Sequence, residues 1–139
     1  MTTTIQSKVL TRTRHLPRIL LGLFFLLPGT LKLAAPFETV MSSYGRGESF
    51  MQALHGTGYL FTLLALTQIS AGLLLLVNRF VPLALTLLAP VIVNIVLFHV
   101  FVVPTPRGLM MSALIVGLEL FMVYRYREVF APFFVGKHL

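Results

Sequence analysis

The sequence predicts an all-α membrane protein, a four-transmembrane-helix bundle with an outer cap of short helices. The 139-residue chain is 57% hydrophobic and only 11% charged, with a mean hydropathy of +0.91, whereas soluble domains carry about 25% charged residues. Four apolar stretches are long enough to cross a hydrocarbon core of about 30 Å as helices. The polar residues gather at the two basic ends and in one long connection.

The chain begins with a basic segment, residues 1–15, which is followed by the first expected span at residues 16–35. Pro28 and Gly29 fall inside this span and are expected to kink its helix. Lys32 stands where a signal peptidase would need small residues, so we expect the stretch to be retained as a span.

The only long connection, residues 36–57, is expected to form the outer cap. The sequence of this connection predicts a short amphipathic helix near residues 37–44, a break at Gly45-Arg46-Gly47, and a second short helix near residues 48–54. The first of these helices has an apolar face at helical spacing, formed by Phe37, Val40, Met41 and Tyr44. We therefore expect the connection to lie ordered at the outer membrane surface.

Three further spans are expected at residues 58–77, 81–103 and 108–126, joined by short turns. In lipid every backbone polar group needs a partner within the protein, so these apolar stretches must be helices. Residues 16–127 then form a single transmembrane domain, and residues 128–139 form a C-terminal tail.

The distribution of basic residues predicts the orientation. With four spans, the side of the N-terminus holds most of the Lys and Arg residues: Lys8, Arg12, Arg14, Arg18, Arg79, Arg125, Arg127 and Lys137. The opposite side holds Arg46 and Arg107, with Lys32 near it. By the positive-inside rule both termini are expected to be cytoplasmic. The same distribution argues against nucleic acid as the reason for the net charge of +7.

Five polar residues inside the spans are the candidates for a ligand-binding site: Lys32, Gln68, Asn94, His99 and Glu119. An ionised side chain at the centre of a span costs about 2.5–3.5 kcal/mol on the insertion scale, so such residues face the bundle and find partners. Helical side chains lean toward their own N-terminus. Lys32 and His99 therefore lean inward, toward the midplane, and Glu119 leans outward, toward them, which predicts one shared polar cavity.

Structural explanations remain open for each candidate. Gln68 and Asn94 also fit hydrogen bonds between packed helices. Lys32 can reach the outer surface by extending its side chain, and His99 can lie near the outer headgroups. Glu119, on one helical stripe with Ser112 and Tyr126, is too deep to reach water in this way.

Composition excludes several chemistries. The chain has no cysteine, which removes disulfide exchange, thiolate nucleophiles and iron–sulfur clusters. His99 is the only histidine well within a span, so bis-histidine haem ligation within one chain is not expected. We expect no metal site.

Two motifs resemble the DoxX family. The first is Arg18-Ile19-Leu20-Leu21-Gly22 leading to Gly29-Thr30-Leu31-Lys32, and the second is Asn94-Ile95-Val96-Leu97-Phe98-His99-Val100-Phe101 followed by Pro104. The resemblance covers residues 18–127. It implies a four-helix bacterial membrane protein located in the cytoplasmic (inner) membrane, and some relatives resemble subunits of quinone-linked oxidoreductases. Because this chain has no cysteine, a thiol-based role is not expected for it.

Three functions follow as hypotheses. The first is an accessory or quinone-binding subunit of a membrane redox complex, with donors from Lys32, His99, Asn94 or Gln68 for the quinone carbonyls. The second is a small transporter or proton-linked carrier that acts as a homodimer, with Glu119 and His99 as titrating groups. The third is a structural or assembly protein without ligand.

Overall fold

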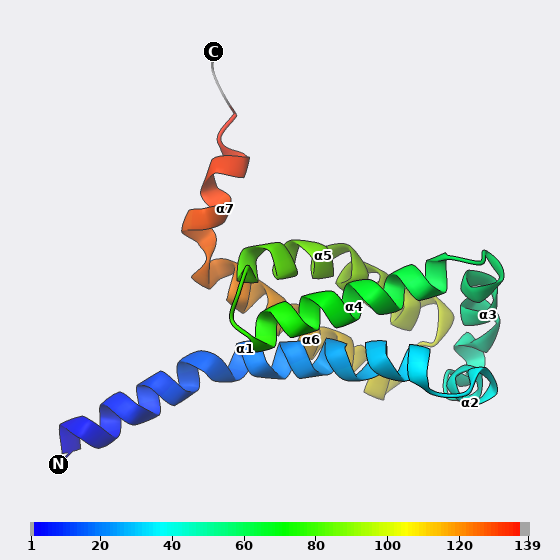
Figure 1. Ribbon diagram of the computed structural model, residues 1–139, viewed down its shortest axis with the longest axis horizontal. Helices are drawn as coiled ribbons and strands as arrows, with labels where there is room; N and C mark the ends of the chain where they lie inside the picture. The colour runs from blue at the N-terminus through cyan, green and yellow to red at the C-terminus, as the bar shows by residue number, and fades with distance from the viewer. Residues whose placement is uncertain (1, 137–139) are drawn as a thin grey trace.

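The computed structural model describes the backbone of residues 2–136 and the side chains of residues 15–136 (Figure 1). Most of the described chain is helical, and the described residues contain no strand. The predicted all-α fold class is therefore confirmed.

Four long helices lie side by side and make up the bundle (Figure 1). They are α1 (Thr2–Ala34), α4 (Leu60–Leu76), α5 (Val81–Leu97) and α6 (Pro106–Arg125), and the five-residue π-helix η2 (Phe98–Val102) extends α5. Helix α1 packs mainly on α4, α4 on α5, α5 on α6, and α6 returns to α1. Each helix thus contacts two neighbours in a closed ring.

Helix α1 is longer than the first expected span. It begins at Thr2 and continues through Pro17 and Pro28, so the basic N-terminal segment belongs to the same helix rather than preceding it. The side chains of Lys8, Arg12 and Arg14 lie outside the described residues, as do Lys137 and His138 of the C-terminal tail.

Three helical segments are long and apolar enough to cross a membrane: His15–Ala34, Val81–Val102 and Pro106–Arg125. Helix α4 meets the same test only together with the preceding helical pair Gly45–Gly56, from which it is bent by 100°. By length and composition, the structure therefore has three spans, or four if this bent pair is counted as one.

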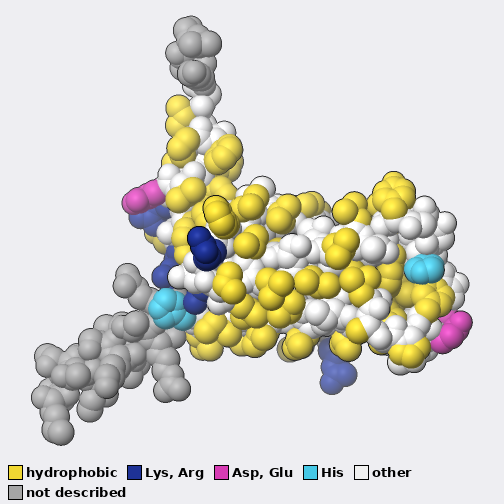
Figure 2. Space-filling view, in the orientation of Figure 1, with side chains coloured by type: hydrophobic (Ala, Val, Ile, Leu, Met, Phe, Trp, Pro, Cys, Tyr) yellow, Lys and Arg dark blue, Asp and Glu magenta, His cyan; other side chains and the backbone are white. Residues whose placement is uncertain are grey.

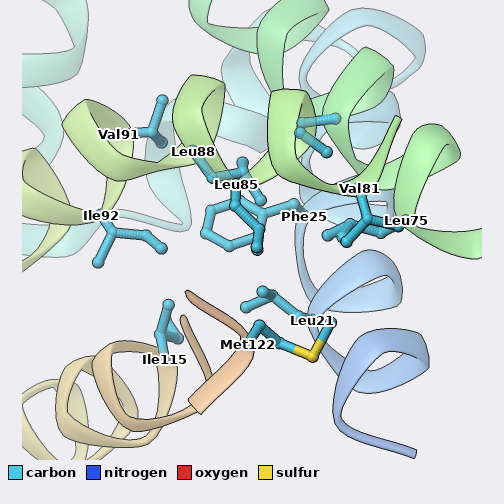
Figure 3. Close-up of a cluster of buried hydrophobic side chains, with 12 residues drawn as sticks. Leu21, Phe25, Leu75, Val81, Leu85, Leu88, Val91, Ile92, Ile115 and Met122 are labelled. Atoms are coloured by element: carbon cyan, nitrogen blue, oxygen red, sulfur yellow. The ribbon is translucent and has the colours of Figure 1, made fainter. Parts of the chain in front are cut away.

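The bundle core is formed by buried apolar side chains from all four helices (Figure 3). Leu21 and Phe25 come from α1, Leu75 from α4, Leu85 and Leu88 from α5, and Ile115 and Met122 from α6. The outer surface of the bundle is also strongly apolar (Figure 2). Large contiguous apolar surfaces are rare on soluble monomers, so this surface fits a lipid environment.

Glycines bring α1 and α4 unusually close together. A Cβ atom added to Gly72 would lie 2.8 Å from the carbonyl oxygen of Gly22 and 2.9 Å from the backbone nitrogen of Leu26. One added to Gly29 would lie 3.1 Å from the carbonyl oxygen of Ala65. Small residues that let backbones approach are typical of membrane helix pairs, and this contact fixes how the polar side chains of α1 and α4 meet.

Three short helices connect α1 to α4: α2 (Phe37–Ser42), the 3₁₀ turn η1 (Gly45–Gly47) and α3 (Glu48–Gly56). They lie together at one end of the bundle (Figure 1). Gly45 begins the turn with φ of +53°, a left-handed conformation that glycine adopts without steric cost.

A small apolar cluster joins these short helices to the bundle. Its buried members are Val40, Met41, Met51 and Phe61, and the ring of Phe98 packs against them. Gly47 lies directly on the Phe98 ring, where a Cβ atom would overlap it. The short helices are thus held against η2 and the start of α4.

The C-terminal part, expected as a tail, contains the helix α7 (Arg127–Phe134). Tyr126 separates it from α6, and α7 runs across the long axis of the bundle and away from it (Figure 1).

Candidate functional site

Lys32 and Gln68 form a hydrogen bond between α1 and α4. The Lys32 ammonium donates to the Gln68 side-chain oxygen over 2.9 Å. Gln68 is only 4% exposed, and Lys32 is half-buried. The pair lies beside Gly29, one of the points at which the two helix backbones approach closely. The structure thus brings together two of the five predicted site residues, which lie 36 positions apart in sequence.

His99 and Ser112 form a second polar pair, between η2 and α6. The His99 Nδ1 atom lies 2.9 Å from the carbonyl oxygen of Ile95 and 3.0 Å from the Ser112 hydroxyl, and that hydroxyl donates to the Gly108 carbonyl oxygen over 2.9 Å. Because a carbonyl oxygen only accepts, this network assigns the proton of a neutral imidazole to Nδ1. The Nε2 atom of His99 is then a hydrogen-bond acceptor.

The backbone around His99 is irregular in a way that the sequence did not reveal. Residues Phe98–Val102 form a single π-helical turn, and such turns frequently occur at functional sites. Gly108 lies against the imidazole so closely that a Cβ atom would overlap its Cδ2 atom. In the sequence, Ser112, Glu119 and Tyr126 repeat at a spacing of seven residues. This polar stripe was the signal that indicated the position of Ser112 on the inner face of its helix.

Glu119 is buried without a hydrogen-bond partner among the described residues. It is 6% exposed, and neither carboxylate oxygen has a donor there. It shares the inner face of α6 with Ile115 and Met122. Glu119 lies about 20 Å of helix rise from Pro106, whereas Lys32 lies within one turn of the end of α1. The two ionisable groups therefore make no direct contact.

Asn94 faces away from the bundle interior. Its side chain is exposed, and its amide nitrogen donates to the carbonyl oxygen of Pro90, one turn earlier in the same helix, over 3.0 Å. The single cavity shared by all five candidates remains a prediction.

A further buried polar residue lies near the opposite end of the bundle. Arg18 is buried and donates to the Leu75 carbonyl oxygen at the end of α4 over 2.9 Å. Its position just inside the first apolar stretch was the signal in the sequence that could have indicated a buried role.

An open apolar groove of about 390 Å³ lies on the outer side of α1. It is lined by Leu20, Leu23, Phe24, Leu27 and Pro28. None of these side chains is polar, so the groove does not coincide with the two polar pairs. Among the described residues no three His, Cys, Asp or Glu side chains lie close enough to hold a metal ion.

The long apolar helices, the apolar outer surface and the buried polar pairs define an α-helical membrane protein. The model of the DoxX family matches residues 14–100, which is more than half of the chain. The protein belongs to the DoxX family. The match includes Lys32, Gln68, Asn94 and His99 and ends before Glu119. No match was found among curated proteins, and none among solved structures.

Proposed function

We propose that the protein is an integral subunit that binds a quinone or a similar lipophilic small molecule for a membrane redox complex. The observation that carries this proposal is the presence of two partly buried polar contacts, Lys32–Gln68 and His99–Ser112, within a mostly apolar helix bundle. Binding sites for such molecules are mostly apolar and contain a few well-placed polar groups.

The two pairs provide complementary chemistry for a quinone. An ammonium group has three N–H donors, and the contact with Gln68 uses one of them. Lys32 can therefore donate to a quinone carbonyl while it keeps its bond to Gln68. The acceptor Nε2 atom of His99 suits the hydroxyl of the reduced quinol. Gln68 and Ser112 hold the two ligand-binding groups in place.

The four-span topology is part of this proposal. Helix α4 has 17 residues, or about 26 Å of helix, slightly less than a hydrocarbon core of about 30 Å. Its close contact with α1 supports its assignment as a span, which brings the number of spans to four. Both termini then lie in the cytoplasm of a bacterium, and α2, η1 and α3 form a cap on the outer side.

Labelling of introduced cysteines tests this topology, because the chain has no cysteine of its own. Ser49 in α3 and Arg79 in the α4–α5 turn are both exposed. In intact spheroplasts Ser49→Cys should react with a membrane-impermeant maleimide, and Arg79→Cys should react only after lysis. The reverse pattern contradicts the orientation, and reaction of both in intact spheroplasts contradicts the four-span count.

Quinone binding is tested by extraction and titration. Protein purified in mild detergent is extracted with organic solvent for mass spectrometry, and a soluble quinone analogue is then titrated into the delipidated protein. Lys32→Met should weaken analogue binding. Thr30→Val is the matched control, because Thr30 is exposed on the same helix and bonds only to the carbonyl oxygens of Leu26 and Leu27. Equal affinity of both variants and the wild type would refute a role for Lys32.

A dimeric transporter or proton-linked carrier is the second candidate, and the exposure of Asn94 favours it. A carboxamide both donates and accepts, so Asn94 can pair with Asn94 of a second copy instead of facing lipid. Oxidative crosslinking of Val93→Cys, an exposed neighbour, should then trap a dimer, and Asn94→Leu should abolish it. Substrate flux into liposomes would favour this function, while absence of both flux and bound ligand would favour a structural or assembly role.

A further inference from the structure

Helix α7 carries an exposed aromatic surface that nothing in the described chain covers. Phe133 is 82% exposed and Phe134 is 85% exposed, and Val129 and Val135 are also largely exposed. At 3.6 residues per turn, Val129, Phe130, Phe133 and Phe134 fall within an arc of about 140°. Glu128 lies on the opposite side of the helix. Helix α7 is therefore amphipathic, and most of its apolar face has no protein partner.

The geometry of α7 shows where this apolar face points. Phe130 belongs to the apolar face and packs against the buried core cluster of the bundle. Helix α7 runs across the bundle axis from the end of α6 (Figure 1). Beyond the edge of the bundle, the same face is thus directed toward the layer that surrounds the spans. In a membrane that layer is lipid.

Basic residues flank the start of α7. The guanidinium of Arg127 lies 4.5 Å from the centre of the Tyr124 ring, and Arg125 ends α6. Arg79, in the turn between α4 and α5, lies at the same end of the bundle because successive spans are antiparallel. Amphipathic helices with aromatic apolar faces and neighbouring basic residues bind in the interfacial layer of bilayers that contain anionic lipid.

We propose that α7 is a membrane-surface helix, with Val129, Phe133 and Phe134 inserted among the acyl chains and Arg127 at the anionic headgroups. The occupant of the exposed face is therefore lipid. The helix would set the height of α6 in the bilayer from its cytoplasmic end. This inference does not depend on quinone binding.

The absence of tryptophan from the sequence allows a direct test. Phe133→Trp places a single tryptophan on the apolar face, and Ala131→Trp places one on the other side of the same helix, where Ala131 is exposed. Both full-length variants are reconstituted in nanodiscs assembled with a scaffold protein that lacks tryptophan. The Phe133→Trp emission should be blue-shifted, strongly quenched by lipids brominated on the acyl chain and weakly quenched by iodide. Ala131→Trp should show the opposite pattern.

Three results would overturn the proposal. Equal quenching of both variants by iodide would show that α7 lies in water. Protection of Phe133→Trp from both quenchers would show that protein, such as a second copy of the chain, covers the face. The third result concerns Arg127 and anionic lipid. If quenching by acyl-chain bromine is equal in zwitterionic and anionic nanodiscs, and Arg127→Gln leaves it unchanged, Arg127 does not contact anionic headgroups. Quenching that rises with anionic lipid and loses this rise in Arg127→Gln would support this contact.

Discussion

A methyl group added at Gly72 should destabilise the protein by forcing α1 and α4 apart. The Cβ atom of Gly72→Ala would lie 2.8 Å from the Gly22 carbonyl oxygen, 2.9 Å from the Leu26 nitrogen and 3.0 Å from the Leu26 Cβ atom. Two of these three atoms are backbone, so no rotamer change can relieve the contacts. The helices must instead separate by about 0.5–1 Å to restore ordinary van der Waals distances.

The expected cost follows from overpacking. Forcing an extra methyl group into a well-packed contact costs about 1–3 kcal/mol. The α1–α4 contact is the most extensive between any two helices of the bundle, so its separation should loosen many contacts at once. The gain in helix propensity from Gly to Ala, about 1 kcal/mol, offsets only part of this cost. We expect a net loss of up to about 2 kcal/mol, which lowers Tm by up to several degrees.

The measurement is thermal unfolding in mild detergent, followed by circular dichroism. Gly117→Ala is the matched control, because Gly117 is exposed in the middle of α6 and an added Cβ atom would meet nothing within 4 Å. Gly117→Ala should unfold at the wild-type temperature or slightly above it. If Gly72→Ala unfolds no earlier than Gly117→Ala, the close approach of α1 and α4 does not exist in the protein.

Three further predictions concern the polar residues. Lys32→Met should leave the buried Gln68 oxygen without its donor and lower the free energy of unfolding by about 1–3 kcal/mol. Adding Gln68→Leu should recover part of this loss, and additive losses of the two substitutions would contradict the pairing. Gly108→Ala should displace the His99 ring and break its hydrogen bond to the serine hydroxyl, so an unchanged imidazole NMR spectrum would refute this packing. Glu119→Leu should unfold at the wild-type temperature or higher, because it removes a buried carboxylate with no donor among the described residues, and about 1–3 kcal/mol of destabilisation would instead reveal a partner.

Sequence periodicity and hydropathy were sufficient for the helical fold class and for most helix positions. The third expected span, residues 81–103, corresponds to the apolar segment Val81–Val102. The last begins at Pro106 rather than residue 108, because the Thr105 side chain accepts from the Gly108 backbone nitrogen and starts the helix there. These features depend on local chemistry and on the need to pair every backbone group in lipid, so they can be read along the chain.

The contacts between polar side chains of different helices could not be predicted from the sequence in this way. Lys32 lies near the end of its expected span and Gln68 about 15 Å of helix rise from the start of the next, yet the long lysine side chain reaches the Gln68 amide between α1 and α4. The lean of helical side chains directed Glu119 toward Lys32, whereas its carboxylate has no hydrogen-bond partner in the described part of the chain. The rotation and height of each helix relative to its neighbours depend on interhelix contacts such as Gly22–Gly72. Periodicity defines the inner face of each helix, but packing determines which residues of two inner faces meet.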